Sequence, residues 1–306
     1  TLFRSTLVNA LLVMLKNDDY DDYYVRGNAA DVLGRLGNNS ETVLSALLER
    51  LMDHESSVRV RAADALVKLG NSSETVVSTL LALLQDDDSD VRGDAAKTLV
   101  DLGNTSETVI STLLALLQDD DSFVRGNAAT ALGNLDNSSE PVVSALLALL
   151  QDDDSFVRGN AATALGNLGN NSETVVSTLL ARLMDHESSV CGDAAIALGR
   201  LGNSSETVVK SLLAQLQNDD SGVRGRAAEA LGKLGNGSET VLNALLPLLK
   251  DDTSFVRGNA ADALGKLGKT SNHVLPTVIE WIEQHQDSDY VGRGIDALWD
   301  LVVGRQ

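Results

Sequence analysis

Several residue types that mark particular classes of protein are scarce in this chain of 306 residues. It holds one cysteine, Cys191, which excludes an internal disulfide framework and suits a reducing compartment, so we expect a cytoplasmic protein. No apolar run approaches the roughly 18 residues that a membrane-spanning helix needs, and no signal peptide opens the sequence. Aromatic residues make up only 3% of the chain, as expected where thin helices pack through Leu, Val and Ala.

Basic residues are also in deficit. The sequence has 24 Lys and Arg against 44 Asp and Glu, which gives a formal net charge of −20. Such a chain repels phosphate backbones and anionic lipids. We therefore predict that neither nucleic acid nor a membrane is its partner.

Residues that could form a catalytic or metal site are scattered. The four histidines and Cys191 show no metal-ligand spacing. Runs of aspartate could hold Ca²⁺ weakly, but they lack the Gly and the distal Glu of an EF-hand loop, and helix capping is the alternative interpretation. No Gly-rich phosphate loop follows a strand. We predict no catalytic residue, no metal and no cofactor.

What the sequence does contain is an internal repeat with a period of 33 residues. Residues 119–135 return unchanged as residues 152–168. A Val-Arg pair recurs at the same period, and Cys191 replaces one of its arginines. The remaining arginines are Arg26, Arg59, Arg92, Arg125, Arg158, Arg224 and Arg257. A fixed period of this length is typical of a stacked repeat array.

Each repeat has the pattern of a helical hairpin. Apolar residues at helical spacing predict a first helix over residues 74–85 and a second over residues 91–102, joined by an aspartate-rich turn. Asn71, three residues before Glu74, resembles the start of a capping box. Gly103 fits the left-handed position that ends a helix.

We predict an all-α fold, a right-handed α-solenoid of about nine such hairpins in one domain over residues 1–306. The repeats are predicted near residues 1–37, 38–70, 71–103, 104–136, 137–169, 170–202, 203–235, 236–268 and 269–306. The last repeat differs in sequence and is predicted to cap the array. Because the chain starts at Thr1, already within a helical pattern, we expect a fragment of a longer protein that is monomeric by itself.

Charged residues at fixed positions are predicted to hold the repeats in register. An aspartate usually lies six residues before the Val-Arg arginine, and the two can meet within a hairpin or bridge to the next hairpin. The alternative is a basic stripe for an anionic partner. Asn218 weakens one rung of this ladder, and Cys191 is expected to leave Asp185 without its arginine.

Glycines inside the second helices predict that these helices approach one another closely. Glycine within a helix costs about 1 kcal/mol relative to alanine, and close packing would offset that cost. The glycines are Gly34, Gly133, Gly166, Gly199, Gly232 and Gly265. The second helices are therefore expected on the short, concave side. Pro247 should kink a first helix, whereas Pro141 lies in a first turn and should be harmless.

These motifs together resemble HEAT repeats. An Asp turn, a Val-Arg pair and then Ala-Ala-x-Ala-Leu-Gly-x-Leu-Gly are similar to the short HEAT-like repeats of phycobilisome lyases. The spacer over residues 69–77 resembles arrays that follow NACHT-type NTPase domains in large cyanobacterial proteins, where the array is thought to be a sensor or ligand-binding arm. The resemblance implies a non-enzymatic scaffold that binds a protein partner through a curved surface. A bilin lyase or isomerase subunit acting on phycobiliproteins is the alternative.

Positions that vary between repeats mark the candidate binding surface. Three positions of the second helices are expected to face outward, as a solvated face or as a mixed concave groove that is basic toward the C-terminal half. The candidate residues on this face are Arg61, Lys97, Asp101, Asn134, Asn167, Arg200, Arg226, Glu229, Lys233 and Lys266. Aromatic residues before the Val-Arg pair form a candidate binding edge or pack between turns; they are Tyr24, Phe123, Phe156 and Phe255.

Overall fold

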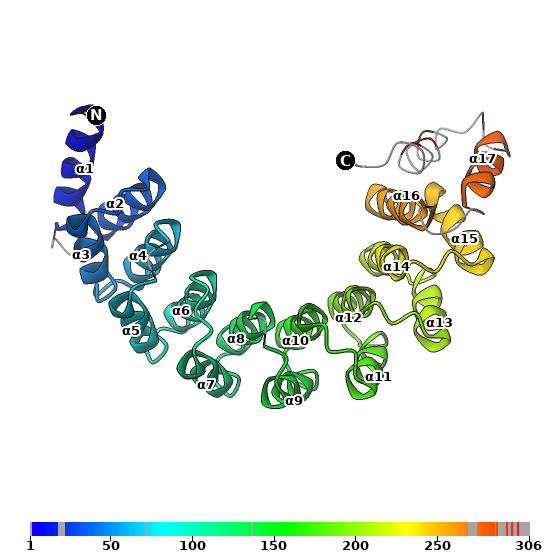
Figure 1. Ribbon diagram of the computed structural model, residues 1–306, viewed down its shortest axis with the longest axis horizontal. Helices are drawn as coiled ribbons and strands as arrows, with labels where there is room; N and C mark the ends of the chain where they lie inside the picture. The colour runs from blue at the N-terminus through cyan, green and yellow to red at the C-terminus, as the bar shows by residue number, and fades with distance from the viewer. Residues whose placement is uncertain are drawn as a thin grey trace. The chain divides into compact units, whose positions relative to one another are not determined.

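The structure is a computed structural model in which all regular structure of the described residues is helical (Figure 1). It describes residues 2–17, 22–70, 72–135, 137–268 and 274–284, and the single positions 286, 292, 295 and 299. The chain forms two compact units, unit 1 over Thr1–Asn137 and unit 2 over Ser138–Gln306. A single domain over residues 1–306 stays a prediction.

The helices follow one another in pairs, as the 33-residue period predicts. Unit 1 contains α1 (Leu2–Leu15), α2 (Tyr23–Leu36), α3 (Glu41–Arg50), α4 (Ser56–Lys68), α5 (Glu74–Leu83), α6 (Ser89–Asp101), α7 (Glu107–Leu116) and α8 (Ser122–Asn134). Unit 2 contains α9 (Glu140–Leu149), α10 (Ser155–Leu168), α11 (Glu173–Arg182), α12 (Ser188–Leu201), α13 (Glu206–Gln215), α14 (Ser221–Leu234), α15 (Glu239–Leu245), the 3-10 helix η2 (Leu246–Lys250), α16 (Ser254–Gly268) and α17 (Val274–Gln284). The predicted all-helical solenoid of hairpins is confirmed. Most of the predicted last repeat after α17 lies outside the described residues.

Serine, rather than the predicted asparagine, caps the first helices. Ser73 is the N-cap of α5, and its Oγ accepts a hydrogen bond from the backbone N–H of Val76 at 3.5 Å. Asn71 lies outside the described residues, but the equivalent Asn104 accepts a bond from the backbone N–H of Ser106 at 3.0 Å. Asparagine therefore shapes the turn, and the predicted capping box was wrong by two residues because both residue types favour caps.

Glycine and proline end helices where the sequence predicts. Gly103 follows α6 with a φ of 71°, a conformation that glycine adopts without strain. Pro141 occupies the first turn of α9. At Pro247 the effect is larger than a kink, since α15 ends at Leu245 and the chain continues as the 3-10 helix η2. A proline nitrogen carries no hydrogen and cannot continue the α-helical bonding.

The second helices of each unit pack closely side by side, on the inner side of that unit (Figure 1). A Cβ atom added to Gly199 of α12 would lie 2.7 Å from the Cα atom of Ala230 in α14. Gly34, Gly166 and Gly232 meet alanines of the next second helix in the same way. The predicted close approach is confirmed at these positions, and it explains why glycine is used inside the helices.

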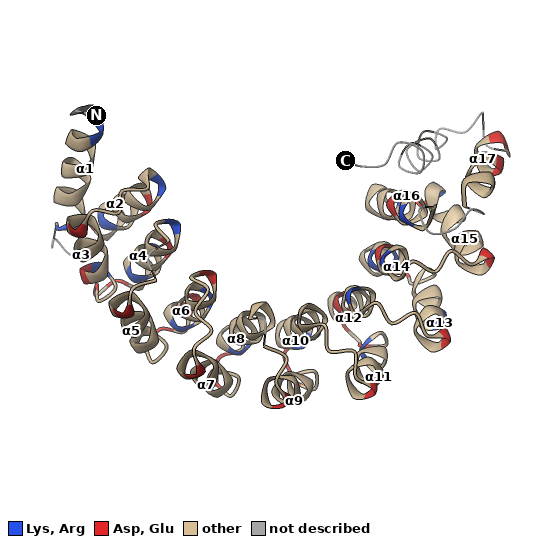
Figure 2. Ribbon diagram, in the orientation of Figure 1, with Lys and Arg blue, Asp and Glu red and all other residues tan. Residues whose placement is uncertain are grey.

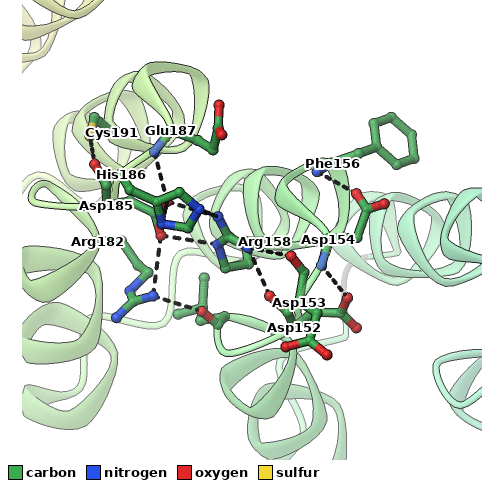
Figure 3. A network of polar contacts seen from close by, with 11 residues as sticks. Asp152, Asp153, Asp154, Phe156, Arg158, Arg182, Asp185, His186, Glu187 and Cys191 are labelled. Carbon is green, nitrogen blue, oxygen red and sulfur yellow. Dashed lines mark hydrogen bonds and ion pairs between the residues drawn. The ribbon is translucent and has the colours of Figure 1, made fainter.

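An Arg–Asp ladder links consecutive turns. Arg158 donates from Nε and Nη2 to the two carboxylate oxygens of Asp185, 27 residues later, at 3.0 and 2.8 Å (Figure 3). Its Nη1 donates to the carbonyl oxygens of Asp152 and Asp153 in its own turn at 2.8 and 3.0 Å. One guanidinium thus holds two successive turns. The pairs with the same bidentate geometry are Arg26–Asp53, Arg92–Asp119 and Arg224–Asp251, and Arg59 reaches Asp86 through one bond.

Burial of these arginines decides between the two sequence interpretations. Arg26 is 0% exposed and Arg158 is 3% exposed. Arg59, Arg92 and Arg224 are half-buried and donate to aspartates of the next turn, so the structural ladder is confirmed and these arginines offer little to an anionic partner. Both predicted contacts, within the hairpin and to the next one, are made by the same side chain.

The ladder carboxylates are held in their charged form. Burial raises the pKa of Asp185. The hydrogen bonds from Arg158 and from the backbone N–H of Glu187, together with the positive charge of Arg158, lower the pKa by more than burial raises it. The pKa values of Asp53, Asp119 and Asp251 are lowered by the same balance. Because the folded-state pKa is below the unfolded value of about 3.9, the ladder stabilises the fold above that pH. This contribution is lost as the pH falls through the folded-state pKa.

Cys191 interrupts the ladder at a different rung from the predicted one. Asp185 is not left without an arginine, because Arg158 binds it and Arg182 donates to it at 3.2 Å. The prediction was wrong because the ladder joins an arginine to the next turn. The residue 27 positions after Cys191 is Asn218, so the arginine and the aspartate of one rung are both replaced.

The two replacements leave no buried charge without its partner. Cys191, 4% exposed, keeps a contact with its own turn through Sγ, 3.1 Å from the carbonyl oxygen of Asp185. Asn218 donates from Nδ2 to Oε1 of Gln215 at 2.9 Å. Burial raises the pKa of the Cys191 thiol, and the charge of Asp185 raises it further. The rung between α12 and the turn before α14 is therefore uncharged.

A different ion pair joins α12 and α14. Arg226 of α14 donates from Nη1 to Oδ1 of Asp193 in α12 at 2.5 Å. Its direction is opposite to that of the ladder, since the earlier repeat supplies the acid. Burial raises the pKa of Asp193, and the charge and hydrogen bond of Arg226 oppose that rise. This interface thus keeps an ionic link at another position.

We predict opposite effects of alanine at two positions of the second helices. Gly199→Ala should destabilise the fold by about 1–3 kcal/mol, because the new methyl group overlaps the α14 backbone. Asp64→Ala in α4 is the control, since Asp64 is an exposed residue inside a second helix. This control should gain up to about 1 kcal/mol from helix propensity. Urea unfolding measures both, and equal effects would contradict the proposed packing.

We also predict that the missing rung can be restored only by two changes together. Cys191→Arg alone places a guanidinium opposite Asn218, and Asn218→Asp alone adds a carboxylate without its arginine. The double variant Cys191→Arg/Asn218→Asp should be more stable than the sum of the single effects by about 1–3 kcal/mol. Urea unfolding of all four proteins gives this coupling energy. Additive effects would show that residues 191 and 218 do not form a rung.

Candidate functional site

The three variable positions of the second helices lie two, five and nine residues after the Val-Arg arginine. The third position is exposed in every described repeat, and we call its residues the exposed row. They are Arg35, Lys68, Asp101 and Asn134 in unit 1, and Asn167, Arg200, Lys233 and Lys266 in unit 2. All lie in the last turn of their helices or at its final residue. Helical periodicity predicted this outward orientation. Whether the row binds a partner stays a prediction.

Candidates at the first variable position are engaged between repeats. Arg61 is half-buried, donates to Oδ1 of Asn28 at 2.6 Å and lies 5.7 Å from the centre of the Tyr24 ring. A Cβ atom added to Gly27 would lie 2.8 Å from Cδ of Arg61. Arg226, paired with Asp193, is also half-buried. These two arginines connect neighbouring helices and offer less free surface than the exposed row.

Candidates at the second position differ from one another. Lys97 of α6 is exposed. Glu229 of α14 is half-buried and pairs with Lys233 of the same helix at 2.7 Å. The neighbouring Asp94 has its pKa raised by burial and by the charge of Asp64, against the charge of Lys97. The second position is therefore mixed in both charge and exposure.

The aromatic edge combines the two roles that the sequence left open. Tyr24 is 65% exposed, and Phe123, Phe156 and Phe255 are 37%, 46% and 47% exposed. A Cβ atom added to Gly225 would lie 2.5 Å from Cε1 of Phe255, so this ring rests on the glycine after the preceding Val-Arg pair. Phe123 contacts Gly93 in the same way. The rings pack between repeats and leave an exposed side.

Comparison with known families decides what these repeats are. The sequence profile described as HEAT repeats matches residues 8–100, 44–133, 77–166, 110–199, 143–231, 176–264 and 209–299. The chain belongs to the HEAT-repeat family. No curated protein sequence matches it.

Solved structures share the HEAT-repeat fold at low sequence identity. The E. coli protein YIBA is 21% identical with a TM-score of 0.62, over 89% of this chain and 95% of YIBA. A chain from a structure of Kap95p with RanGDP is 14% identical with a TM-score of 0.62, over 99% of this chain and 46% of that one. Importin beta is 16% identical with a TM-score of 0.60, over 97% and 46%. The chain therefore spans about half the length of the last two, and these likenesses show the fold alone.

Charge is distributed differently on the two kinds of helix in these HEAT repeats, and second helices such as α12 and α14 carry both signs (Figure 2). Each first helix from α3 to α15 begins with an exposed glutamate. The ladder arginines are buried or half-buried, whereas the exposed row carries cations. The net negative charge of the chain is thus displayed mainly on first helices and turns.

Acidic side chains are among the lining residues of three grooves in the described part of the chain. One of about 510 Å³ lies between two turns of unit 1, where Met52, His54 and Asp87 are among its lining residues. Within the described ranges, no three His, Cys, Asp or Glu side chains are grouped so that they could hold a metal ion. Nor is any helix of that part long and apolar enough to cross a membrane.

Sequence reasoning missed the Asp193–Arg226 pair. A signal for it existed, because the two residues occupy the same repeat position 33 residues apart and carry opposite charges. Equivalent positions hold asparagine in several repeats, such as Asn127, Asn160 and Asn259. At this interface the opposite charges at equal positions accompany a contact between the second helices α12 and α14.

Proposed function

We propose that this chain is a non-enzymatic scaffold that binds a protein partner through the exposed row and the second-helix surface around it. HEAT-repeat solenoids are usually scaffolds of this kind, and the stacked second helices of each unit offer a regular surface. The exposed row carries the proposal. Its residues differ between repeats, while the Gly–Ala and Arg–Asp contacts recur in most of them. Variable surface residues on a constant scaffold are expected where the surface binds a specific partner.

The setting that we propose is an arm of a larger regulatory protein, in which the array senses or binds a ligand for a NACHT-like NTPase domain. Support for this setting comes from the spacer over residues 69–77, which resembles such arrays. A long solenoid suits the role, because binding at several repeats can act on a domain joined to one end.

A bilin lyase subunit is the alternative function, and the described part of the chain gives it little support. The chain's one cysteine is buried. A tetrapyrrole would need a largely apolar pocket. Acidic residues such as Asp86 and Asp119 line a described groove instead. An unchanged bilin absorption spectrum on mixing with the chain would exclude this alternative.

We predict that three alanines on the exposed row remove the partner. The variant Arg35→Ala/Asp101→Ala/Asn134→Ala shortens exposed side chains at helix ends of unit 1, where alanine is well tolerated. The control variant Ser78→Ala/Ser111→Ala/Ser177→Ala changes exposed residues of first helices. Affinity capture followed by mass spectrometry should recover the same protein with the wild type and the control, and not with the row variant.

Circular dichroism must show equal helix content in all three proteins for this comparison. If the row variant and the control retain the partner equally, the exposed row is not the binding surface. Loss of the partner from the control alone would place binding on the first helices instead.

A further inference from the structure

We propose that the exposed row of unit 2 binds an extended acidic segment of a partner protein, with Arg200, Lys233 and Lys266 as the contacting cations. This inference rests on the proposed function and adds the charge and the conformation of the bound segment.

Three consecutive repeats place a cation at the same exposed position. Arg200, Lys233 and Lys266 lie near the ends of α12, α14 and α16, which pack side by side (Figure 2). Packed helices are about 8–10 Å apart, so the three charges form a line of roughly 20 Å. The fourth member of the row in unit 2 is Asn167, which is neutral. No acid interrupts this line.

The three cations are exposed, although Lys233 and Lys266 each have an acid one turn earlier in their helix, Glu229 and Asp262. Arg200 donates to the neutral Oδ1 of Asn167 at 2.5 Å, and the residue one turn before it is Ile196. Among the described residues Arg200 and Lys266 have no carboxylate at ion-pair distance, and the charge of Arg200 acts on Asp193 only from further away, where it opposes the rise that burial causes in the pKa of that carboxyl. Lys233 pairs with Glu229 of its own helix but remains exposed. All three therefore keep donors for a partner's carboxylates.

Unit 1 shows the contrast. Its Lys68 is bound to Asp31 of the preceding second helix at 2.6 Å, and Arg35 lies 3.8 Å from the same carboxylate. The row then continues with Asp101. An acidic segment would find fewer free donors in unit 1 and would meet repulsion at Asp101. The cationic line is thus a feature of unit 2.

The net charge of −20 makes this site more selective as a place for an acidic segment to bind. Screening limits electrostatic attraction to about 8 Å at physiological salt, so local cations decide the sign felt by a bound segment. Elsewhere the acidic surface repels carboxylates, which fixes where an acidic segment can lie. Duplex DNA carries a charge about every 1.7 Å of its axis and would extend over the surrounding acids. A short acidic peptide suits three cations better.

The spacing of the repeats sets the conformation of the segment. A segment in the polyproline II conformation has three residues per turn and advances about 3.1 Å per residue. Every third side chain therefore points the same way, about 9 Å further along, which matches the distance between neighbouring second helices. Carboxylates at every third residue would then meet one cation in each repeat. We expect a segment with Asp or Glu at positions one, four and seven.

The test is fluorescence anisotropy with the whole chain and a labelled peptide of the pattern Glu-Ser-Gly, repeated. A peptide with Gln in place of Glu is the matched control ligand. Wild type should bind the Glu peptide roughly tenfold or more tighter, as expected for three exposed charge contacts. Arg200→Gln/Lys233→Gln/Lys266→Gln should lose that preference, and Lys233→Arg/Lys266→Arg should keep it.

A second variant separates the site from general charge. Lys16→Gln/Lys210→Gln/Lys250→Gln removes the same charge from exposed positions away from the row and should bind as the wild type does. Equal loss in both triple variants would overturn the proposal. Equal affinity for the Glu and Gln peptides would overturn it too, as would tighter binding of a DNA oligonucleotide. The alanine variants that test the proposed function keep all three cations, so the two failures are distinguishable.

Discussion

One arginine that holds two turns is the interaction on which this structure depends. The guanidinium of Arg92 accepts no hydrogen bonds and donates in fixed directions, so it can bind the carbonyls of its own turn and the carboxylate of the next turn together. The distance between turns is fixed by this geometry. Glycine and alanine then let neighbouring second helices approach to the same spacing, as Gly199 and Ala230 do. The outward positions follow at equal intervals along each unit.

The repeat with Cys191 shows that the ladder is replaceable at a single interface. Loss of the arginine alone would leave a partly buried carboxylate without its partner, which is costly. Replacement by Cys191 and Asn218 together avoids that cost, and Asp193 with Arg226 supplies an ion pair between the same helices. Apolar packing of α12 on α14 stays as extensive as at neighbouring interfaces. In a linear array each interface contributes separately, so such a local exchange is tolerated.

The sequence allowed most of the fold to be predicted, because a repeat shows the same physical solution several times. The Val-Arg and Asp positions predicted the ladder, and the helical glycines predicted close packing. The error at Asp185 arose because separations of six and 27 residues both fit the repeat, and only the stacking distance distinguishes them. For the candidate site, periodicity predicted exposure at Arg200 and Lys266. It could not show that Arg61 and Arg226 are engaged, since that depends on distances between repeats.

The most direct test of this account is a double-mutant cycle on one intact rung, Arg92→Gln and Asp119→Asn, followed by urea unfolding. The two residues meet through bonds of 2.9 and 2.8 Å with their side chains 16% and 13% exposed. A charge-assisted pair in this setting should give a coupling energy of about 1–3 kcal/mol. If the two substitutions are additive within about 0.3 kcal/mol, the ladder does not hold the repeats in register.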